Sequence, residues 1–358
     1  MKKTIRQCVG IDCSKDTLDG AIGFLKEDFR QEVHATEVFE NNDKGFGQLM
    51  KWMKKLCLKE LPCQVVVEAT GVYHERLAYA LVKNDFAIAV VLPNKIRNYC
   101  RSTDVRTVTD KISAKQIAEF GLVKTLDNWV MPDEVFRYLK GFCRERTQLL
   151  KEKTSAHNQM HAYEYSALVA SGTEKRSTQR IRFLEKQIEQ IKNDVQVVVN
   201  EHPWLSEKLE KICSINGVGL LTATTVVAET NGFNLIRNCR QLVCYAGYDV
   251  VMKQSGTSVN SKPRISHKGN KHIRRALHFP AITVVRNDER FANFYNRLFD
   301  KQKIKMKSYV AVQRKLLVLI YTLWKKDEVY NPEEQQHSHK LLEQPQRAAL
   351  TELDLIRS

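Results

Sequence analysis

The feature that most constrains the fold is a short apolar segment near the start of the chain that ends in a single carboxylate. It runs from Cys8 to Asp12, and small polar residues follow at once. A β-prone apolar run of this length is typical of a buried central strand whose last side chain emerges at the edge of a sheet. A carboxylate in that place is unfavourable unless it is paired or binds a metal ion. We therefore expect a sheet with a polar site at one edge.

Two further acids end or begin predicted elements in the same part of the chain. The strand expected at 64–68 ends in Glu68, and Asp110 follows Thr109 where a helix is expected to begin. Carboxylates at the ends of three elements, with Asp12 as the first, suit hard, oxygen-binding cations such as Mg²⁺. A plainer interpretation stays open, in which an aspartate at the end of a strand caps a helix or binds a substrate.

Residues 1–130 alternate between strand and helix patterns. The expected order is β-β-β-α-β-α-β-α, which is that of an α/β ribonuclease-H-like sheet, with an antiparallel meander first and crossover units after it. A stretch with four cations that includes a flexible loop is expected between residues 94 and 109, near the carboxylates. The expected elements after the first strand are strands at 20–24, 32–39, 64–68 and 87–92 and helices at 44–59 and 74–84.

The formal net charge of +16 at pH 7 indicates a polyanionic partner. Residues 205–330 hold 22 Lys and Arg against 9 Asp and Glu, so +13 of the charge lies in one segment. Because contacts with phosphate groups depend on Lys and Arg, that segment is the predicted nucleic-acid-binding region.

Cysteine usage and hydropathy bear on the cellular compartment. The nine cysteines are odd in number and include no Cys-x-x-Cys pair, which indicates reduced thiols in the cytoplasm. The longest clear apolar stretches, such as 86–92, have the length of a strand and are too short to span a bilayer. We therefore expect a cytoplasmic protein with no membrane partner.

Residues 133–201 change in character. Apolar residues between 181 and 198 recur at alternating steps of three and four, which is the spacing of a heptad seam, and Ser171 to Thr173 separates two predicted helices. An antiparallel helical hairpin and a dimerising coiled coil both fit, and the second would make the chain a homo-oligomer, a dimer or a tetramer. The predicted domains are 1–130, a coiled-coil linker at 131–204, a mainly helical basic domain at 205–330 and a polar tail at 331–358.

Two glycines, Gly217 and Gly219, lie between two predicted helices of the basic domain. Glycine lets a backbone approach a phosphate closely, and the helix that follows offers free N–H groups at its N-terminus. Helix-hairpin-helix modules bind DNA backbones in this way. A tight packing turn is the alternative.

The most distinctive stretch comes next. A loop of small polar residues at 254–258 precedes a basic segment at 262–275, in which six Lys and Arg are interleaved with Gly and Ser. This mixture suits phosphate contacts, although a solvated basic face has the same composition. By composition alone, any serine of the loop is a turn former. The candidate nucleic-acid contacts are Arg264, Lys268, Lys271, Arg274 and Arg275.

Taken together, these segments resemble the DEDD-type transposases of insertion sequences, which are related to the Piv DNA invertases. Each motif alone is weak, and their order and spacing over roughly residues 5–325 carry the resemblance. The motifs are Val9-Gly10-Ile11-Asp12, Val67-Glu68-Ala69-Thr70-Gly71, Thr109-Asp110-Lys111-Ile112-Ser113-Ala114, Ile215-Asn216-Gly217-Val218-Gly219, Tyr245-Ala246-Gly247, Ser255-Gly256 and Ile265-Ser266-His267-Lys268-Gly269-Asn270.

The resemblance implies a RuvC-like nuclease domain, a coiled-coil linker and a separate transposase domain. It also implies DNA recombination, directed in some members by a structured RNA. Members cut through a serine nucleophile that is assisted by Mg²⁺, and the matching positions for the ion here are Asp12, Glu68 and Asp110. The resemblance assigns the nucleophile to Ser255, because this serine precedes a glycine ahead of the segment Ser266–Asn270.

The chain departs from the family at one position. The family's fourth acid lies three residues after the third, where this chain has Ser113, and neither Asp104 nor Glu119 has a spacing that replaces it. Serine keeps an oxygen but supplies no charge, so metal affinity is expected to fall. Besides a recombinase, two alternatives therefore stay open. One is a Holliday-junction-type resolvase that needs only water as its nucleophile, and the other is a nucleic-acid-binding relative whose catalysis is weakened or lost.

Overall fold

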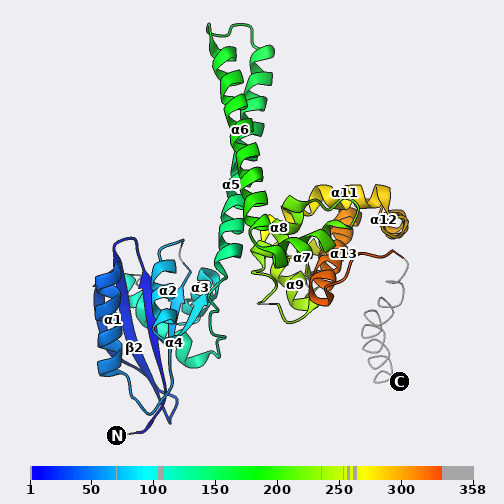
Figure 1. The fold of residues 1–358 in the computed structure, drawn as a ribbon. Coiled ribbons are helices and arrows are strands. Elements are labelled where there is room, and N and C mark those ends of the chain that lie inside the picture. Colours follow the sequence, from blue (N-terminus) through cyan, green and yellow to red (C-terminus); the bar gives the residue numbers. More distant parts are fainter. Residues whose placement is uncertain are drawn as a thin grey trace, which may run out of the picture. The chain divides into compact units, whose positions relative to one another are not determined.

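The computed structural model describes residues 2–69, 71–103, 109–234, 236–252, 254–255, 259–260 and 264–332. The chain divides into two compact units, Met1–Met131 and Pro132–Ser358. The first unit is built around a sheet and the second is largely helical (Figure 1). The polar tail that the sequence analysis placed at 331–358 lies almost entirely outside the described residues.

A five-stranded sheet forms the centre of the first unit. Its strand order is β3-β2-β1-β4-β5, with β1, β2 and β3 antiparallel and with β4 parallel to both β1 and β5. This is an antiparallel meander followed by crossover units, so the predicted order of elements is confirmed. The strands are β1 (Thr4–Cys13), β2 (Thr17–Lys26), β3 (Gln31–Glu40), β4 (Cys63–Glu68) and β5 (Ala87–Val91).

The two faces of the sheet carry different helices, because side chains alternate along a strand. Odd-numbered residues of β1 and β4, such as Val9 and Val67, pack in one cluster with α1 (Asp43–Leu56) and α2 (Glu75–Lys83). The even-numbered Cys8 and Val66 pack on the other face with α3 (Pro93–Cys100) and α4 (Asp110–Val123).

The helix α3 is an element that the sequence analysis did not predict. It takes up the first part of the stretch that was expected to include a loop. Residues 93–100 are helical because Pro93, which ends the strand pattern, also occupies the first helical turn, where proline is favoured. The buried Ile96 then anchors the helix in the cluster on the α4 face. The remaining part of the predicted loop, 104–108 with Arg106, lies outside the described residues.

Two glycines allow α4 to lie close to the sheet. A Cβ atom on Gly10 would come within 2.2 Å of the Ala118 nitrogen and 2.4 Å of the Ala114 oxygen, both in the backbone of α4. A Cβ atom on Gly121 would lie 2.2 Å from Cys8 Sγ. Position 121 thus meets position 8, and position 114 meets position 10, so α4 runs antiparallel to β1. The start of α4 is therefore directed to the end of β1 that carries Asp12.

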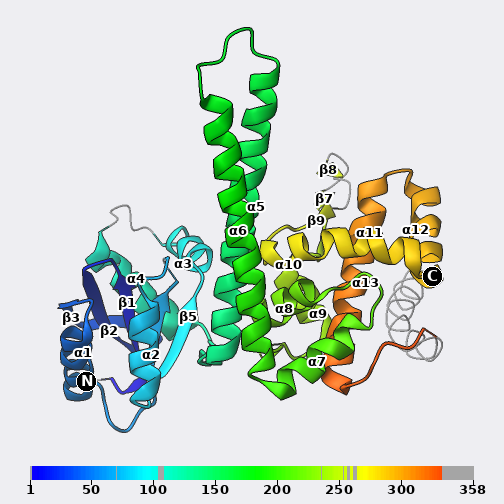
Figure 2. The same ribbon diagram turned by 45° about the horizontal axis from the view of Figure 1, so that its top comes forward.

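The second unit begins with a long helical hairpin, α5 (Glu134–Glu164) and α6 (Thr173–Asn200), which is visible in Figure 2. Gly172 takes a left-handed conformation, φ 78°, at the start of α6. The predicted seam is buried at Ile181, Leu184, Ile191 and Val195, and Val199 takes the place expected for Val198. Within the chain, the two helices pack as a hairpin, which is one of the two arrangements that the sequence leaves open.

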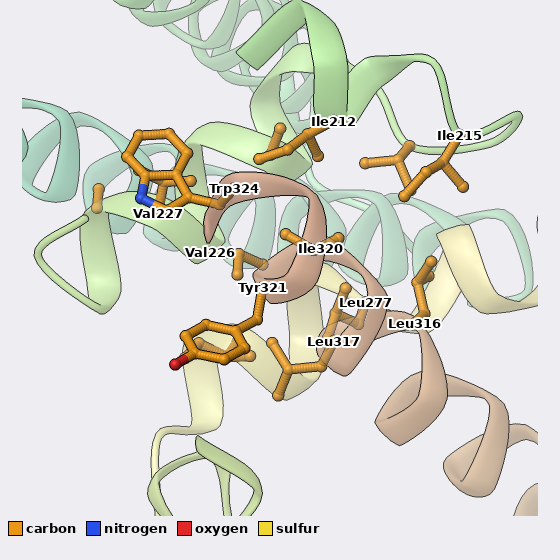
Figure 3. Packing of buried hydrophobic residues seen from close by; sticks show 14 of the residues in the cluster. Ile212, Ile215, Val226, Val227, Leu277, Leu316, Leu317, Ile320, Tyr321 and Trp324 are labelled. Atoms are coloured by element: carbon orange, nitrogen blue, oxygen red, sulfur yellow. The ribbon is translucent and has the colours of Figure 1, made fainter. Parts of the chain in front are cut away.

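Much of the remaining core lies around α13 (Lys305–Lys326). Its buried side chains lie among residues of α7 (Pro203–Cys213), α8 (Leu220–Glu229) and the start of α11 (His278–Asn287) in Figure 3. The same hydrophobic cluster includes Phe136 of α5 and Val195 of α6. Because they share one core, the base of the hairpin and the basic segment form one unit. No helix of the described residues is long and apolar enough to cross a membrane.

The helices are α7 (Pro203–Cys213), α8 (Leu220–Glu229), α9 (Cys239–Ala246), α10 (Lys271–Ala276), α11 (His278–Asn287), α12 (Glu289–Gln302) and α13 (Lys305–Lys326). Two short antiparallel pairs lie between α9 and α10. They are β6 (Val250–Val251) with β9 (Arg264–Ile265), and β7 (Gln254–Ser255) with β8 (Val259–Asn260).

The close approach of α4 gives a first prediction. In Gly10→Ala the new methyl group meets backbone atoms that cannot rotate away, so we expect the substitution to destabilise the first unit by about 1–3 kcal/mol. Calorimetric unfolding of the full chain measures the shift. Gly47→Ala is the matched control, because a Cβ atom there meets nothing within 4 Å on α1. Equal melting of the two variants would contradict the proposed role of Gly10.

Candidate functional site

Two of the predicted acids lie on the face of the sheet that α4 covers. In β1 the even-numbered Cys8 and Gly10 face α4, and alternation gives Asp12 the same direction. In β4 the same holds for Val66 and therefore for Glu68. The last pair in the parallel register is Ile11 with Val67, so Asp12 and Glu68 follow as neighbours at the ends of adjacent strands.

The third predicted acid comes from α4 itself. Asp110 is the first residue of the helix, and the side chain of Thr109 caps it by accepting a hydrogen bond from the Ile112 N–H at 3.3 Å. Residues four apart share a helix face, and Ala114 lies on Gly10. Asp110 is thus one turn closer than Ala114 to the strand ends. The structure therefore brings the three predicted acids to one region.

The sequence analysis missed a fourth acid in this region. Asp19 on β2 pairs directly with Asp12 in the antiparallel register. Ala21 packs on Ala114 and Ala118 of α4, so Asp19, two residues before it, faces the same side. The expected strand began at residue 20, and that boundary left Asp19 out. An acid inside an otherwise apolar strand was the signal that could have found it.

The electrostatics of the cluster follow from its burial. The pKa of Asp12 is raised to about 6, chiefly by burial and in addition by the negative charges of Glu68, Asp110 and Asp19. Burial also raises the pKa of Asp19, and the charge of Asp110 adds to this shift, whereas Lys111 opposes it. The region therefore holds more negative charge than its own cations balance, as expected where a cation is to bind.

The chemistry of the cluster fits a hard divalent cation. All of its charged donors are carboxylate oxygens, which Mg²⁺ prefers. Among the residues that the structure describes, no three His, Cys, Asp or Glu side chains already stand close enough to hold an ion. Mg²⁺ usually keeps several water ligands and binds through one or two carboxylates, so a closed cage is not required. Ser113, on the first turn of α4, is half-buried and adds no charge.

The second predicted site is a tightly packed basic loop between α9 and α10. Its backbone approaches the end of α9 so closely that a Cβ atom on Gly269 would lie 2.4 Å from the Gly247 nitrogen. The backbone N–H of Asn270 donates to the backbone carbonyl oxygen of Tyr245 at 2.7 Å. The Asn270 side chain caps α10 by accepting a hydrogen bond from the His272 N–H at 2.9 Å. Glycine and asparagine therefore fix the loop against α9 and α10.

A buried ion pair anchors this loop to the helical hairpin. Glu229 at the end of α8 is 2% exposed and accepts hydrogen bonds from Arg144 Nε of α5 at 2.7 Å and from Asn270 Nδ2 at 2.7 Å. Burial alone would raise the pKa of Glu229, but these hydrogen bonds outweigh it and hold the pKa below its usual value. The Tyr245 hydroxyl donates to the Glu229 carbonyl oxygen at 2.7 Å. None of these roles was predicted, because the partners are far apart in the chain.

The predicted cations of the basic segment, which come from β9, this loop and α10, separate into two groups. Arg274 is half-buried, and its guanidinium donates to the carbonyl oxygen of Ala246 at 2.7 Å, so it supports the loop. The other four are exposed and are available to a ligand. They are Arg264, Lys268, Lys271 and Arg275. A cavity of about 400 Å³ lies beside them, with Arg275, His278 and Phe279 among its lining residues.

The two glycines between α7 and α8 also differ. Gly217 has φ 105°, and a Cβ atom there would lie 2.9 Å from the Thr283 side chain of α11, which is the tight packing turn of the alternative interpretation. At Gly219, just before α8, a Cβ atom would meet nothing within 4 Å. Open space for a ligand is therefore found at Gly219 only.

The structure describes the backbone of Ser255 in β7, paired with Val259, and not its side chain. Residues 256–258 and 261–263 lie outside the described residues. The position of Ser255 relative to the exposed cations therefore stays a prediction.

Two family models match separate parts of the chain. Residues 9–163 match a DEDD family of IS110 type whose description is "Transposase". Residues 209–296 match the "Transposase IS116/IS110/IS902 family". The chain is also similar to the "Pilin gene-inverting protein" of Moraxella bovis, with 28% identity over 320 residues, which cover 88% of this chain and 94% of that protein. The protein of the same name from Moraxella lacunata matches to the same extent.

Among solved structures, the chain is similar to Thermus thermophilus RuvC, with 11% identity and a TM-score of 0.27 over 34% of this chain and 99% of that one. A second RuvC structure, in complex with a Holliday junction substrate, has 12% identity and a TM-score of 0.24 over 31% of this chain and 90% of that one. Scores this low do not establish a fold, and the description of the sheet rests on its strand order.

The buried ion pair gives a second prediction. A carboxyl group whose pKa is lowered by folding stabilises the folded state above its usual pKa, and this contribution is lost as the pH falls through the folded value. Near pH 7 we therefore expect Glu229→Gln to destabilise the second unit by about 1.5–3 kcal/mol. The difference from the unmodified protein should shrink as the pH falls below the usual pKa of a glutamate, about 4.3. Urea unfolding at a series of pH values measures both effects.

Glu189→Gln is the control for this series. Glu189 is an exposed acid of α6, 3.0 Å from Lys192, and pairs of this kind contribute little. A difference between the unmodified protein and Glu229→Gln that stays constant over the pH range would show that the ion pair is not the source.

Proposed function

The chain belongs to the IS110-type family of DEDD transposases, and we propose from its site that it cuts and exchanges DNA strands with Mg²⁺ held by Asp12, Glu68 and Asp110. Its family and its gene-inverting relatives make it a DNA transposase or recombinase. The observation that carries the finer proposal is the convergence of the three acids on the α4 face at the strand ends. Three separate elements supply them, and only folding brings them together.

When bound, the cation would supply positive charge beside the scissile phosphate, which offsets the charge that develops during displacement. The residues themselves have separate tasks. Asp12 and Glu68 are fixed by adjacent buried strands, so their backbone positions are rigid. Asp110 is positioned by α4, whose distance from the sheet is set by Gly10. This preorganisation supports in-line attack on a phosphodiester.

Substrate binding is proposed for the basic segment of the second unit. Its four exposed cations suit contacts with DNA phosphates, and the loop that precedes α10 is held by the hydrogen bond from Asn270 to Glu229. Arg274 acts indirectly, through the carbonyl oxygen of Ala246. Gly219 and the start of α8 offer a further phosphate contact of the helix-hairpin-helix kind.

We assign the nucleophile to Ser255, in agreement with the family resemblance. Its oxygen would form a bond to phosphorus, and the bond from phosphorus to one deoxyribose oxygen would break. That oxygen takes up a proton, and the serine loses one, so the numbers of phosphate esters and protons are conserved. DNA stays attached to the protein until a second strand end reverses the step. A serine needs activation for such a step, and the exposed cations of the neighbouring loop would provide it.

Two partners complete the proposal. A structured RNA is proposed on the family resemblance and on the +13 charge of residues 205–330, which exceeds what one loop needs. A second copy of the chain is proposed to bind along the helical hairpin as a coiled coil. Large apolar side chains are exposed there, including Leu168 at 95% and Phe183 at 60% of their surface. A pair of hairpins would cover them.

A second candidate function is a nucleic-acid-binding relative with weakened catalysis. Ser113 favours it, because the site lacks the family's fourth acid. A resolvase that uses water is disfavoured by the large basic region of the second unit, which such chemistry does not need.

The metal proposal predicts that Asp12→Asn abolishes cutting. Asparagine keeps the size of the side chain but removes its charge, and the loss of one ligand from such a site typically reduces activity by orders of magnitude. Incubation of the full chain with DNA that carries the ends of its own element, in Mg²⁺, separates strand exchange, nicking and simple binding. We expect only binding from the variant, with an affinity close to that of the unmodified chain. Undiminished cutting by Asp12→Asn would overturn the proposal.

The nucleophile proposal predicts a covalent adduct that depends on Ser255. The unmodified chain, incubated with nicked DNA that traps the intermediate, should give a protein–DNA band that survives denaturation. Ser255→Ala should lose the band, and Ser258→Ala, a change in the same loop, should keep it. An adduct in Ser255→Ala would assign the nucleophile to another side chain. Cutting without any adduct in the unmodified chain would favour water.

A further inference from the structure

The residue paired with Asp12 on the adjacent strand β2 is another acid. Asp12 and Asp19 are directly opposed in the antiparallel pair of β1 and β2, and both face α4. In such pairs the Cβ atoms lie about 4.5–5.5 Å apart, and like charges in this arrangement destabilise the sheet. The hairpin would be more stable with almost any other residue at position 19.

The burial of Asp19 strengthens this argument. The residue is only 9% exposed. Among the described residues, its carboxylate has no hydrogen bond and no ion pair, and its oxygen atoms are not fully enclosed by protein atoms, so an ion can reach them. An acid in a largely buried residue, without a protein partner and directly opposite Asp12 on the face that α4 covers, points to a cation as its partner.

We propose that Asp19 is the fourth carboxylate of the cation site and supplies the charge that Ser113 does not. This inference rests on the proposed function, because it assumes that Asp12, Glu68 and Asp110 bind the ion. It differs from the family's arrangement, in which the fourth acid stands on the same helix as the third. Here the fourth acid comes from the sheet, from the strand next to Asp12.

The geometry makes this exchange possible. Ala114 of α4 lies over Gly10 and Ala21, which form the cross-strand pair next to the Asp12–Asp19 pair on the α4 face. Asp110, one helical turn before Ala114, is therefore directed to the Asp12–Asp19 pair. The site receives one acid from each of β2, β1 and β4 and one from α4. A full set of four carboxylates is thus present without an acid at position 113.

The test measures ion binding as well as activity. We expect Asp19→Asn in the full chain to weaken Mg²⁺ and Mn²⁺ binding about 10-fold or more, as judged by titration calorimetry. In EDTA the same variant should melt a few degrees higher than the unmodified chain, because a like-charge pair is removed. When Mg²⁺ is added, the melting temperature of the variant should rise by less than that of the unmodified chain. If Asp19 had a purely structural role, Asp19→Asn would instead melt at a lower temperature than the unmodified chain in EDTA.

Two further variants serve as controls. Asp16→Asn removes the same charge from an exposed position in the turn before β2, and it should leave ion affinity unchanged. Adding Ser113→Asp to Asp19→Asn should restore ion binding, because the acid returns from the helix side. Restoration would show that the fourth charge matters and that the fold of the variant is intact.

The outcomes separate this inference from the proposed function. If the unmodified chain binds the ions and Asp19→Asn binds them equally well, Asp19 is not part of the site, and the proposed function stands. If the unmodified chain binds no Mg²⁺ or Mn²⁺ at all, the proposed metal site itself fails and takes this inference with it.

Discussion

The contact between α4 and the central sheet is the constraint on which the first unit depends. Helices usually rest on a layer of side chains, but here the backbone of α4 lies against Gly10, and Gly121 of the helix lies against Cys8. This close approach fixes both the distance and the direction of the helix, so Asp110 lies above the ends of β1 and β4. The same face buries Asp19 beside Asp12. The folded sheet therefore holds repelling carboxylates close together, and a divalent cation is the simplest source of compensating charge.

In the second unit, a buried ion pair plays the comparable part. Glu229 has no access to water, and its charge is compensated by Arg144 from the hairpin and by Asn270 from the basic loop. One carboxylate thus connects α5, α8 and the segment that leads into α10. Removing a partner from such a buried group is unfavourable, so the loop keeps one position. The exposed cations then stand on a rigid support, which favours a defined path for a DNA backbone over loose electrostatic attraction.

Local patterns predicted much of this structure. The alternation of apolar residues gave the strands and their order, Thr109 and the acid after it gave the start of α4, and the heptad spacing gave the buried face of α6. Errors arose where two local signals competed. Pro93 ends a strand and also opens a helix, and only the burial of Ile96 decides that α3 forms. The second strand was expected to begin at residue 20 but begins at Thr17, and this late boundary removed Asp19 from consideration.

The sequence by itself determined which residues are available: three acids at the ends of elements, a basic segment with glycines, and a serine where the family's fourth acid would stand. Only the tertiary structure decided which of them meet. The pairing of Asp12 with Asp19 depends on the register of a hairpin. The support of the basic loop by Arg144 depends on two contacts of Glu229, with residues 85 and 41 positions away in the chain. Such contacts produce no repeating pattern in the sequence, because a buried charge needs only one partner. The packing of the folded chain alone sets which residue that partner is.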